Sequence, residues 1–411
     1  MSAAECLVYS KVMPKISRRG LEMPSSPIRK LAPLANEAKR AGVKVYHLNI
    51  GQPDLPTPQK ALDSLKTIDR KTLEYSPSEG FSSLREKLVG YYAKFGMNDI
   101  APENIIVTAG GSEAILLTFL ACMNPGDEMI MVEPGYANYI SFAVTAGIVV
   151  RTVTSYIEDG FKLPPMEAFE EVITPRTRAI LLCNPGNPTG AVYSPEELRK
   201  IKELVLKHDL YLISDEVYRE FVYTEEPYVS VMSLGIPEHA ILIDSVSKRY
   251  SECGIRIGMI VTHNRLVYDT IMKYCQARLS PPLLGQIVAE ASIEGTEEYA
   301  RKCYAEYKSR RDFFIKGLNS IPGVFSPMPH GAFYTVASLP VADAEDFCRW
   351  CLTDFRMDGE TVMMAPAAGF YRNPDLGRNQ VRLAYVLCRE DLQRSLMLIR
   401  GALKAYNHRG V

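Results

Sequence analysis

Residues 240–258 read AILIDSVSKRYSECGIRIG, a short apolar run followed at once by polar side chains and glycines. The run Ala240–Asp244 has the length and composition of a strand that is buried on both faces. Helical patterns such as Ser112–Met123 and Pro195–His208 separate several runs of this kind, which predicts a mostly parallel sheet covered by helices. The other runs are Ile105–Thr108, Glu128–Val132, Ile148–Thr152, Ala179–Cys183, Leu210–Ser214 and Gly258–Val261.

The parts of the chain outside this alternating region follow a different pattern. A charged helix is expected over Glu297–Leu318, and a helix is expected over Ile28–Ala41. The later strands are expected near Gly331–Val336, Thr361–Met364 and Gln380–Val386. We therefore predict an α/β protein with a large central domain (65–294), a smaller discontinuous α+β domain (28–64 and 295–411) and a loosely ordered N-terminal arm (1–27).

The composition excludes several classes of function. The 411 residues carry 47 Lys and Arg against 48 Asp and Glu, a formal charge of −1, which argues against a nucleic-acid partner or a membrane surface. An apolar run among the longest, Ala114–Met123, is far shorter than a membrane span. The nine cysteines are odd in number and irregularly spaced, which suits a reducing, cytoplasmic location.

The pair Cys348 and Cys351 has the spacing of a redox or zinc motif. It lies in a helical pattern with no second ligand pair nearby, so we expect no metal site.

The residues that follow each strand are the first candidates for a binding site, because ligands of open α/β sheets lie beyond the carboxyl ends of the strands. Gly110, Gly111 and Ser112 open a helix after the run 105–108, an arrangement suited to phosphate or to a simple capped turn. Asp215 and Tyr218 follow the run 210–214, where Asp215 binds a cation or caps the following loop.

The quoted stretch adds a nucleophile. Lys248 follows a buried strand, and a lysine held in a pocket can lose its proton and attack a carbonyl. Ser245 and Arg256 flank it and suit a phosphate. Arg382, within an apolar strand, needs an anionic partner from the protein or a ligand, whereas Asn187 lies in a Pro/Gly turn that is structural on its own. Together these groups suit an anionic cofactor with an aldehyde and a ring nitrogen, which describes pyridoxal phosphate.

The order of these motifs resembles the class I/II aminotransferases of the fold-type I pyridoxal-phosphate superfamily, from about Pro27 to the C-terminus. The matching motifs are Gly51-Gln-Pro-Asp, Tyr75-Ser-Pro-x-x-Gly80, Gly110-Gly-Ser112, Asn187-Pro-Thr-Gly, Asp215-x-x-Tyr218, Ser245-x-x-Lys248, Arg256 and Arg382.

The resemblance implies a role for each position. Lys248 would form the Schiff base and shuttle the proton, Asp215 would keep the pyridine nitrogen protonated, and Tyr218 and Asn187 would bind the ring oxygen O3′. The phosphate would be held by Gly110, Gly111, Ser112, Ser245 and Arg256. Tyr136 would stack on the ring, the position where several relatives use a tryptophan; the single tryptophan here, Trp350, lies elsewhere.

The resemblance also implies the partners. Tyr75 would reach the phosphate of the neighbouring subunit, so a homodimer with shared sites is expected. Arg382 would bind the substrate α-carboxylate, helped by Asn187 and the backbone at Gly51. Arg278 is one candidate among several for a second carboxylate, although a surface or interface role is the interpretation we favour.

The expected activity is transfer of an amino group from aspartate, alanine, an aromatic or a similar α-amino acid to a 2-oxo acid, with 2-oxoglutarate as the expected acceptor, by a ping-pong mechanism. A pyridoxal-phosphate C–S lyase or an aminocyclopropane-carboxylate-synthase-like lyase uses the same cofactor residues and is the alternative. A DNA-binding regulator with a fused aminotransferase domain is disfavoured, because only about 50 residues precede the first motif.

Overall fold

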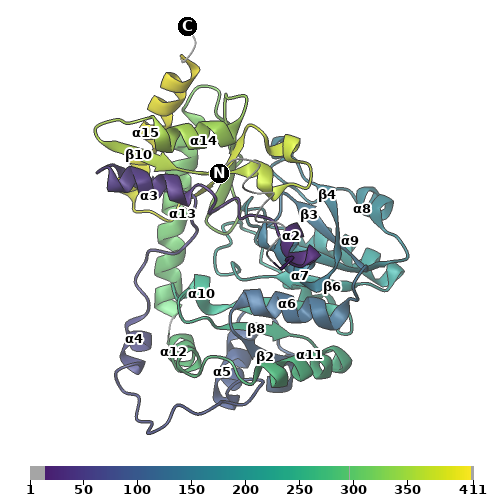
Figure 1. Cartoon of the computed structure of the whole chain (residues 1–411). Helices are drawn as coiled ribbons and strands as arrows, with labels where there is room; N and C mark the ends of the chain where they lie inside the picture. Colours follow the sequence, from purple (N-terminus) through teal and green to yellow (C-terminus); the bar gives the residue numbers. More distant parts are fainter. Residues whose placement is uncertain (1–13, 296, 409–411) are drawn as a thin grey trace.

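A seven-stranded sheet forms the centre of the computed structural model, which describes residues 14–295 and 297–408 (Figure 1). The strand order is β2-β8-β7-β6-β5-β3-β4. The strands are β2 (Ile105–Thr108), β3 (Glu128–Glu133), β4 (Val149–Thr154), β5 (Thr177–Cys183), β6 (Tyr211–Asp215), β7 (Ala240–Ser245) and β8 (Gly258–Val261). Only β8 runs antiparallel to its neighbours within this sheet, so the prediction of a mostly parallel sheet is confirmed.

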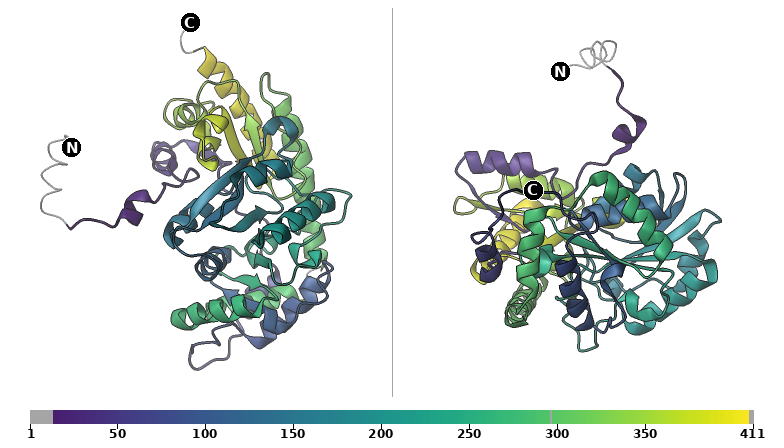
Figure 2. Two further views of the ribbon diagram at one scale, coloured as in Figure 1. Left: turned by 90° about the vertical axis from the view of Figure 1, so that its right-hand side faces the viewer. Right: turned by 90° about the horizontal axis from the view of Figure 1, so that it is seen from below.

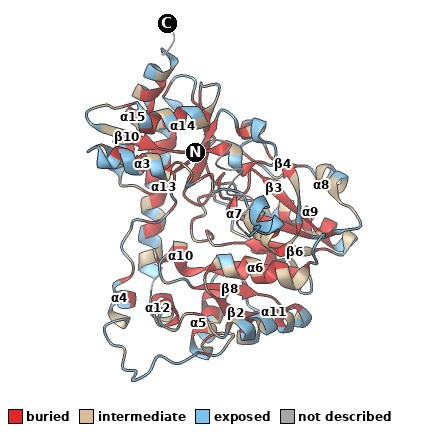
Figure 3. Cartoon of the chain, in the orientation of Figure 1, coloured by how far each residue is buried: buried red, intermediate tan, exposed pale blue. Residues whose placement is uncertain are grey.

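Helices cover both faces of this sheet, because successive side chains of a strand point to opposite faces. On β7, Leu242 packs into the core under α5 (Ser82–Ala93), α8 (Met166–Val172), α9 (Pro195–His208) and α12 (Leu283–Ile293). The next residue, Ile243, packs into the core under α6 (Gly111–Cys122), α7 (Asn138–Ala146) and α11 (Arg265–Arg278). Figure 3 shows the strands buried between helices whose outer faces are exposed.

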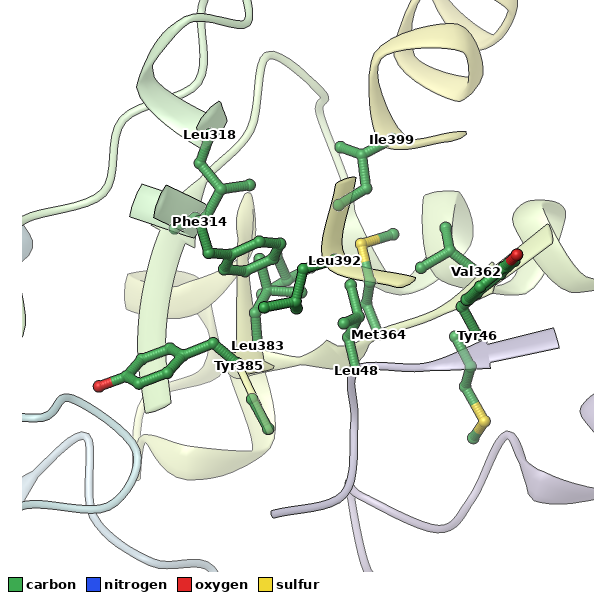
Figure 4. Packing of buried hydrophobic residues seen from close by; sticks show 14 of the residues in the cluster. Tyr46, Leu48, Phe314, Leu318, Val362, Met364, Leu383, Tyr385, Leu392 and Ile399 are labelled. Carbon is green, nitrogen blue, oxygen red and sulfur yellow. The ribbon is translucent and has the colours of Figure 1, made fainter. Parts of the chain in front are cut away.

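Segments from both ends of the chain meet in a separate core (Figure 4). Here β1 (Lys44–His47) pairs in parallel with β10 (Glu360–Met363), and β11 (Ala365–Pro366), β12 (Gln380–Ala384) and β9 (Tyr334–Ser338) form an antiparallel sheet. Leu48 from the N-terminal segment packs with Leu383 and Ile399 in this core. The surrounding helices are α3 (Ala32–Arg40), α13 (Glu297–Asn319), α14 (Ala344–Thr353) and α15 (Arg389–Asn407).

Short helices complete the fold. They are α2 (Arg18–Glu22), α4 (Gln59–Ser64), α10 (Val246–Arg249) and the 3₁₀ turns η1 (Pro102–Asn104), η2 (Ile157–Asp159), η3 (Val231–Leu234), η4 (Ala367–Phe370) and η5 (Pro374–Gly377). Among them, α10 continues directly from β7 and so presents its residues at the carboxyl edge of the sheet (Figure 1). No helix of residues 14–295 or 297–408 has a stretch long and apolar enough to cross a membrane.

Several expected boundaries move. The helix expected from Ile28 begins at Ala32, since residues 27–31 form a turn and Pro33 suits only a first helical turn. The strand expected near Gly331 begins at Tyr334. The expected arm contains the exposed helix α2, which projects from the body of the chain (Figure 2) and is capped where Ser17 Oγ accepts from the Gly20 amide. Residues 1–13 of that arm, including Cys6, lie outside the described residues.

Candidate active site

A cavity of about 780 Å³ opens at the carboxyl ends of β5, β6 and β7. It lies where strand ends and residues of the second core meet, since Tyr334 of β9 and Arg382 of β12 also line it. The structure brings most of the predicted site residues to its wall: Gly51, Gly111, Ser112, Tyr136, Asn187, Asp215, Tyr218, Ser245, Lys248, Arg256 and Arg382.

Close packing of glycines shapes one corner of the cavity. Gly110 has a positive φ of 87°, and a Cβ there would overlap the Arg256 guanidinium. A Cβ at Gly258 would overlap the backbone of Gly110 and Gly111. These glycines let the start of α6 approach Arg256. The free N–H groups of the helix start and the guanidinium therefore lie together at this corner of the cavity. Such a corner suits a phosphate.

The lysine is held next to this corner by a short helix. Ser245 caps α10, where its Oγ accepts from the Ser247 amide at 3.1 Å. This cap fixes the helical turn that carries Lys248 into the cavity. There Lys248 Nζ donates to the carbonyl of Gly51 at 3.1 Å and lies 3.8 Å from Cys253 Sγ. An amine on the cavity wall, beside a phosphate corner, can condense with an aldehyde carried by a phosphate ester.

Asp215 is the only carboxylate among the described residues of the cavity wall. Its Oδ2 accepts a hydrogen bond from the Tyr139 hydroxyl at 2.7 Å, and its side chain is buried. Burial raises the pKa of Asp215 to about 6, and the bond from Tyr139 opposes that rise. A buried carboxylate of this kind is stabilised by a cationic N–H in the cavity, which a protonated ring nitrogen would supply.

Tyr218 is positioned by aromatic contacts from the other core. Its hydroxyl lies 3.0 Å from the hydroxyl of Tyr334, and its ring packs in T-shaped contacts with the rings of Phe333 and Tyr334. Burial raises the pKa of the Tyr218 phenol well above its usual value, so the hydroxyl stays protonated and can donate.

Arg382 is a buried cation, 1% exposed, without a carboxylate partner among the described residues. Its Nη1 donates to Asn187 Oδ1 at 3.2 Å, and its Nη2 donates to the carbonyl of Asn49. The guanidinium lies over the Tyr334 ring, 4.8 Å from the centroid. Burial lowers the pKa of Arg382, which an anionic ligand would reverse. This geometry fits a carboxylate held by a planar fork.

Some expected residues lie away from the cavity wall. Gly110 lies directly behind it, against Arg256. Tyr75 is 76% exposed, before α5, and its assignment to a neighbouring subunit stays a prediction. Arg278 does not line the cavity, since it pairs with Glu113 at 3.2 Å and donates to the Ser78 carbonyl at 2.9 Å. Cys348 lies buried on α14, and the described part of the chain has no cluster of metal ligands.

Three residues that contribute to the cavity were not predicted from the sequence. Tyr139 lies in α7, three residues after Tyr136, and this short separation is the signal in the sequence that could have indicated it. Tyr334 comes from β9, far along the chain, and nothing in its own sequence neighbourhood connects it to Tyr218. Arg29 also lines the cavity, from the turn before α3, as an exposed cation.

Comparisons with known proteins show the family of the chain. Residues 43–388 match the family described as aminotransferase class I and II. The chain is 33% identical to a putative aminotransferase, YugH, of Bacillus subtilis over 92% of this chain and 95% of that protein. It is 31% identical to the aspartate/prephenate aminotransferase of Thermus thermophilus over 93% of this chain and 97% of that protein.

Solved structures give the same result for the fold. Thermus thermophilus aspartate aminotransferase with maleate has a TM-score of 0.86 at 29% identity, covering 95% of this chain and all of that chain. Alanine aminotransferase from Pyrococcus furiosus has a TM-score of 0.88 at 28% identity with the same coverage. The chain therefore belongs to the class I and II aminotransferases, pyridoxal-phosphate-dependent enzymes of fold type I.

Proposed function

We propose that this aminotransferase moves an amino group from an α-amino acid to a 2-oxo acid, with 2-oxoglutarate as acceptor, in a ping-pong reaction. The observation that carries the proposal is one cavity shared by Lys248, Asp215 and Arg382, a cation that has no carboxylate partner among the described residues. An amine, a ring-nitrogen partner and a carboxylate fork are the groups that the transfer requires.

Pyridoxal phosphate, when bound, supplies an aldehyde that condenses with amines and a ring that accepts electrons. The protein's own residues would bind the cofactor and the substrate and would move the protons. Asp215 holds the proton on the ring nitrogen, and Lys248 moves a proton at the substrate α-carbon. The corner of Gly110, Gly111, Ser112, Ser245 and Arg256 would hold the phosphate. Tyr218 and Asn187 would donate to the ring oxygen, and Tyr136 would cover the ring face.

Substrate orientation would come from Arg382. Its fork already has Asn187 and Asn49 as fixed neighbours, so an α-carboxylate would dock against a preorganised guanidinium. Gly51 lies next to Lys248 and would limit where the substrate backbone can lie.

The nature of the substrate side chain is suggested by Arg29. Within the described part of the chain, its guanidinium has no hydrogen bond or ion pair. The other cations of the wall, Lys248, Arg256 and Arg382, already have proposed roles. We therefore place donors with a second carboxylate, such as aspartate, ahead of alanine, in keeping with the aspartate aminotransferases among the relatives.

We also propose a homodimer in which Tyr75 completes the partner's phosphate site. The side chains of Leu73, Leu279 and Leu284 are apolar and exposed, which supports a second copy of the chain covering this side of the molecule.

The proposed division into domains (28–64 with 295–411, against 65–294) is supported by the pairing of β1 with β10. A cytosolic location rests on cysteines that are buried without disulfide partners in the described chain, such as Cys275 and Cys303.

The test is a half-reaction with the purified enzyme. Aspartate alone, without a 2-oxo acid, should convert the bound cofactor to pyridoxamine phosphate, followed by its visible absorbance. Added 2-oxoglutarate should restore the starting spectrum and yield glutamate. Release of pyruvate and ammonia from a cysteine conjugate, without that conversion by any amino acid, would contradict the proposal and identify a lyase.

A further inference from the structure

A buried ionic cluster lies beneath the cavity, on the α5 face of the sheet. Asp244, near the end of β7, accepts hydrogen bonds from Arg249 at 2.8 Å, Tyr92 at 3.0 Å and Arg219 at 3.2 Å. Its side chain is fully buried, and those of Arg219 and Arg249 are 1% and 2% exposed. Glu216 completes the cluster, 3.5 Å from Arg219.

Each charged member of the cluster is the chain neighbour of a proposed cofactor residue. Glu216 follows Asp215, Arg219 follows Tyr218, Asp244 precedes Ser245, and Arg249 follows Lys248. The neighbours line the cavity while the cluster members point away from it. A shift of the cluster therefore moves the backbone of β6, β7 and α10 at the points that carry these cofactor residues.

The contacts of Asp244 connect these elements directly. Arg249 donates to both carboxylate oxygens, Nη1 to Oδ1 at 3.3 Å and Nη2 to Oδ2 at 2.8 Å, which forms a fork. The Ser245 amide also donates to Oδ1 at 2.7 Å. The Arg249 guanidinium lies 4.1 Å from the Tyr91 ring centroid of α5, so the residue after Lys248 is fixed on several sides.

Stability alone is a weak reason for such a cluster. Buried ion pairs lose much of their attraction to desolvation, and apolar side chains often replace them without loss. Arg219 Nε and Arg249 Nε also have no hydrogen-bond partner within residues 14–295 and 297–408. What the pairs do supply is geometry, because a bidentate fork allows little rotation.

We propose that Asp244, with Arg219 and Arg249, is a positioning group that sets the placement of Lys248, Tyr218 and Ser245 for the cofactor. This inference rests on the proposed roles of those residues. Asp244 touches no part of the cavity itself, and it acts through the backbone of its neighbours.

The charge of the cluster also reaches the cavity. Burial chiefly raises the pKa of Asp215, and the charge of Asp244 adds to that rise. Around Asp244 lie Arg219, Arg249 and Tyr92, with Tyr91, Glu216 and Tyr228 on the adjoining segments. In Asp244→Asn the two guanidinium charges lose their closest compensating charge. Protonated groups in the cavity should then lose their protons at lower pH.

The test compares full-length Asp244→Asn with a matched control, Glu128→Gln. Glu128 is also a fully buried carboxylate that pairs with two arginines, Arg151 and Arg176, but it lies at the opposite, amino end of its strand β3. Each purified protein, loaded with cofactor, is dialysed against a series of pyridoxal phosphate concentrations. Visible absorbance gives the dissociation constant and the pH midpoint of the bound cofactor, and thermal unfolding gives the stability.

We expect Asp244→Asn to raise the cofactor dissociation constant about tenfold or more, equivalent to 1.4 kcal/mol, and to lower the pH midpoint. Glu128→Gln should lose stability but keep both cofactor properties of the wild type. An Asp244→Asn protein with the wild-type constant and midpoint, or equal changes in both variants, would overturn the inference. A wild type that does not bind pyridoxal phosphate would overturn the proposed function instead.

Arg249→Lys tests the positioning role if Asp244→Asn does not fold. The lysine keeps the charge but loses the fork and the contact with Tyr91. The dissociation constant should rise several-fold while the melting temperature stays near that of the wild type. An unchanged constant in this variant would contradict the positioning role.

Discussion

The Tyr139 hydroxyl donates a hydrogen bond to Asp215 Oδ2 at 2.7 Å, deep in the wall of the cavity. This bond links α7 to the end of β6, so that a tyrosine on one element affects the pKa of a carboxyl group on the other. It lowers the pKa of Asp215, although burial still raises that pKa to about 6.

Tyr139→Phe should therefore raise the pKa of Asp215 further, because the carboxylate loses a donor to its charged form. The proposed reaction needs Asp215 ionised, so the acidic limb of the kcat/KM profile should move to higher pH. Steady-state rates between about pH 5 and 9 measure this shift. Tyr223→Phe is the matched control, since its buried hydroxyl bonds to the Ala332 carbonyl instead. An unmoved acidic limb in Tyr139→Phe would contradict the coupling.

Asp215→Asn should stabilise the chain when the cofactor is removed. The folded-state pKa is raised to about 6, so the folded chain binds a proton more tightly than the unfolded chain, and stability falls as pH rises from about 4 to 6. Asparagine does not titrate and so avoids this loss, which should raise the free energy of unfolding by up to about 3 kcal/mol at pH 7.

Urea unfolding at pH 7 and at pH 3.5 measures this effect, and the lower pH serves as the internal control. The gain should largely disappear there, where the carboxyl is mostly protonated in both states. A less stable Asp215→Asn protein at pH 7 would show that the carboxylate is satisfied without a cofactor.

Gly110→Ala should weaken phosphate binding. Its Cβ would displace the Arg256 guanidinium, and its positive φ costs about 1 to 3 kcal/mol for a residue other than glycine. Gly126→Ala shares the positive φ (92°) but its Cβ meets open space. Both variants should lose stability, and only Gly110→Ala should bind pyridoxal phosphate more weakly. Equal cofactor affinity in the two variants would count against a phosphate corner at Arg256.

Arg382→Lys should weaken binding of the amino acid and leave binding of the cofactor unchanged. Loss of the fork should raise KM for the donor roughly 10- to 100-fold, as expected for a charged hydrogen-bond pair. Arg311→Lys is the control, because Arg311 is also a buried arginine, stacked on Tyr223 and away from the cavity wall. Loss of bound cofactor from Arg382→Lys would mean that this arginine has a different role.

The sequence predicted the sheet and the strand-end residues for the same reason. Residues such as Asp215 and Ser245 follow buried apolar runs, and parallel strands bring their carboxyl ends to one edge. What could not be predicted depends on contacts between distant segments. Tyr334 reaches Tyr218 from another sheet, and Asn49 reaches Arg382 across most of the chain.

Local chemistry also limited the boundary predictions. The apolar spacing from Ile28 matches a helix, yet residues 27–31 form a turn, in which the Ile28 carbonyl accepts a hydrogen bond from the distant Asn49 Nδ2. The cluster around Asp244 could not be predicted for a related reason. Its charged residues have no distinctive sequence pattern, and they meet only because four segments converge in the fold.

Lys248→Ala tests the proposed function most sharply, with the visible absorbance of bound pyridoxal phosphate and the half-reaction with aspartate as the two measurements. Lys248 provides both the amine that condenses with the cofactor and the proton transfer at the substrate α-carbon, so its loss should abolish the lysine-dependent absorbance and reduce turnover by several orders of magnitude. The protein should remain folded and should still bind the phosphate of the cofactor at the corner beside Arg256. Retained absorbance and turnover at the wild-type level would contradict the role of Lys248 and the proposed aminotransferase reaction.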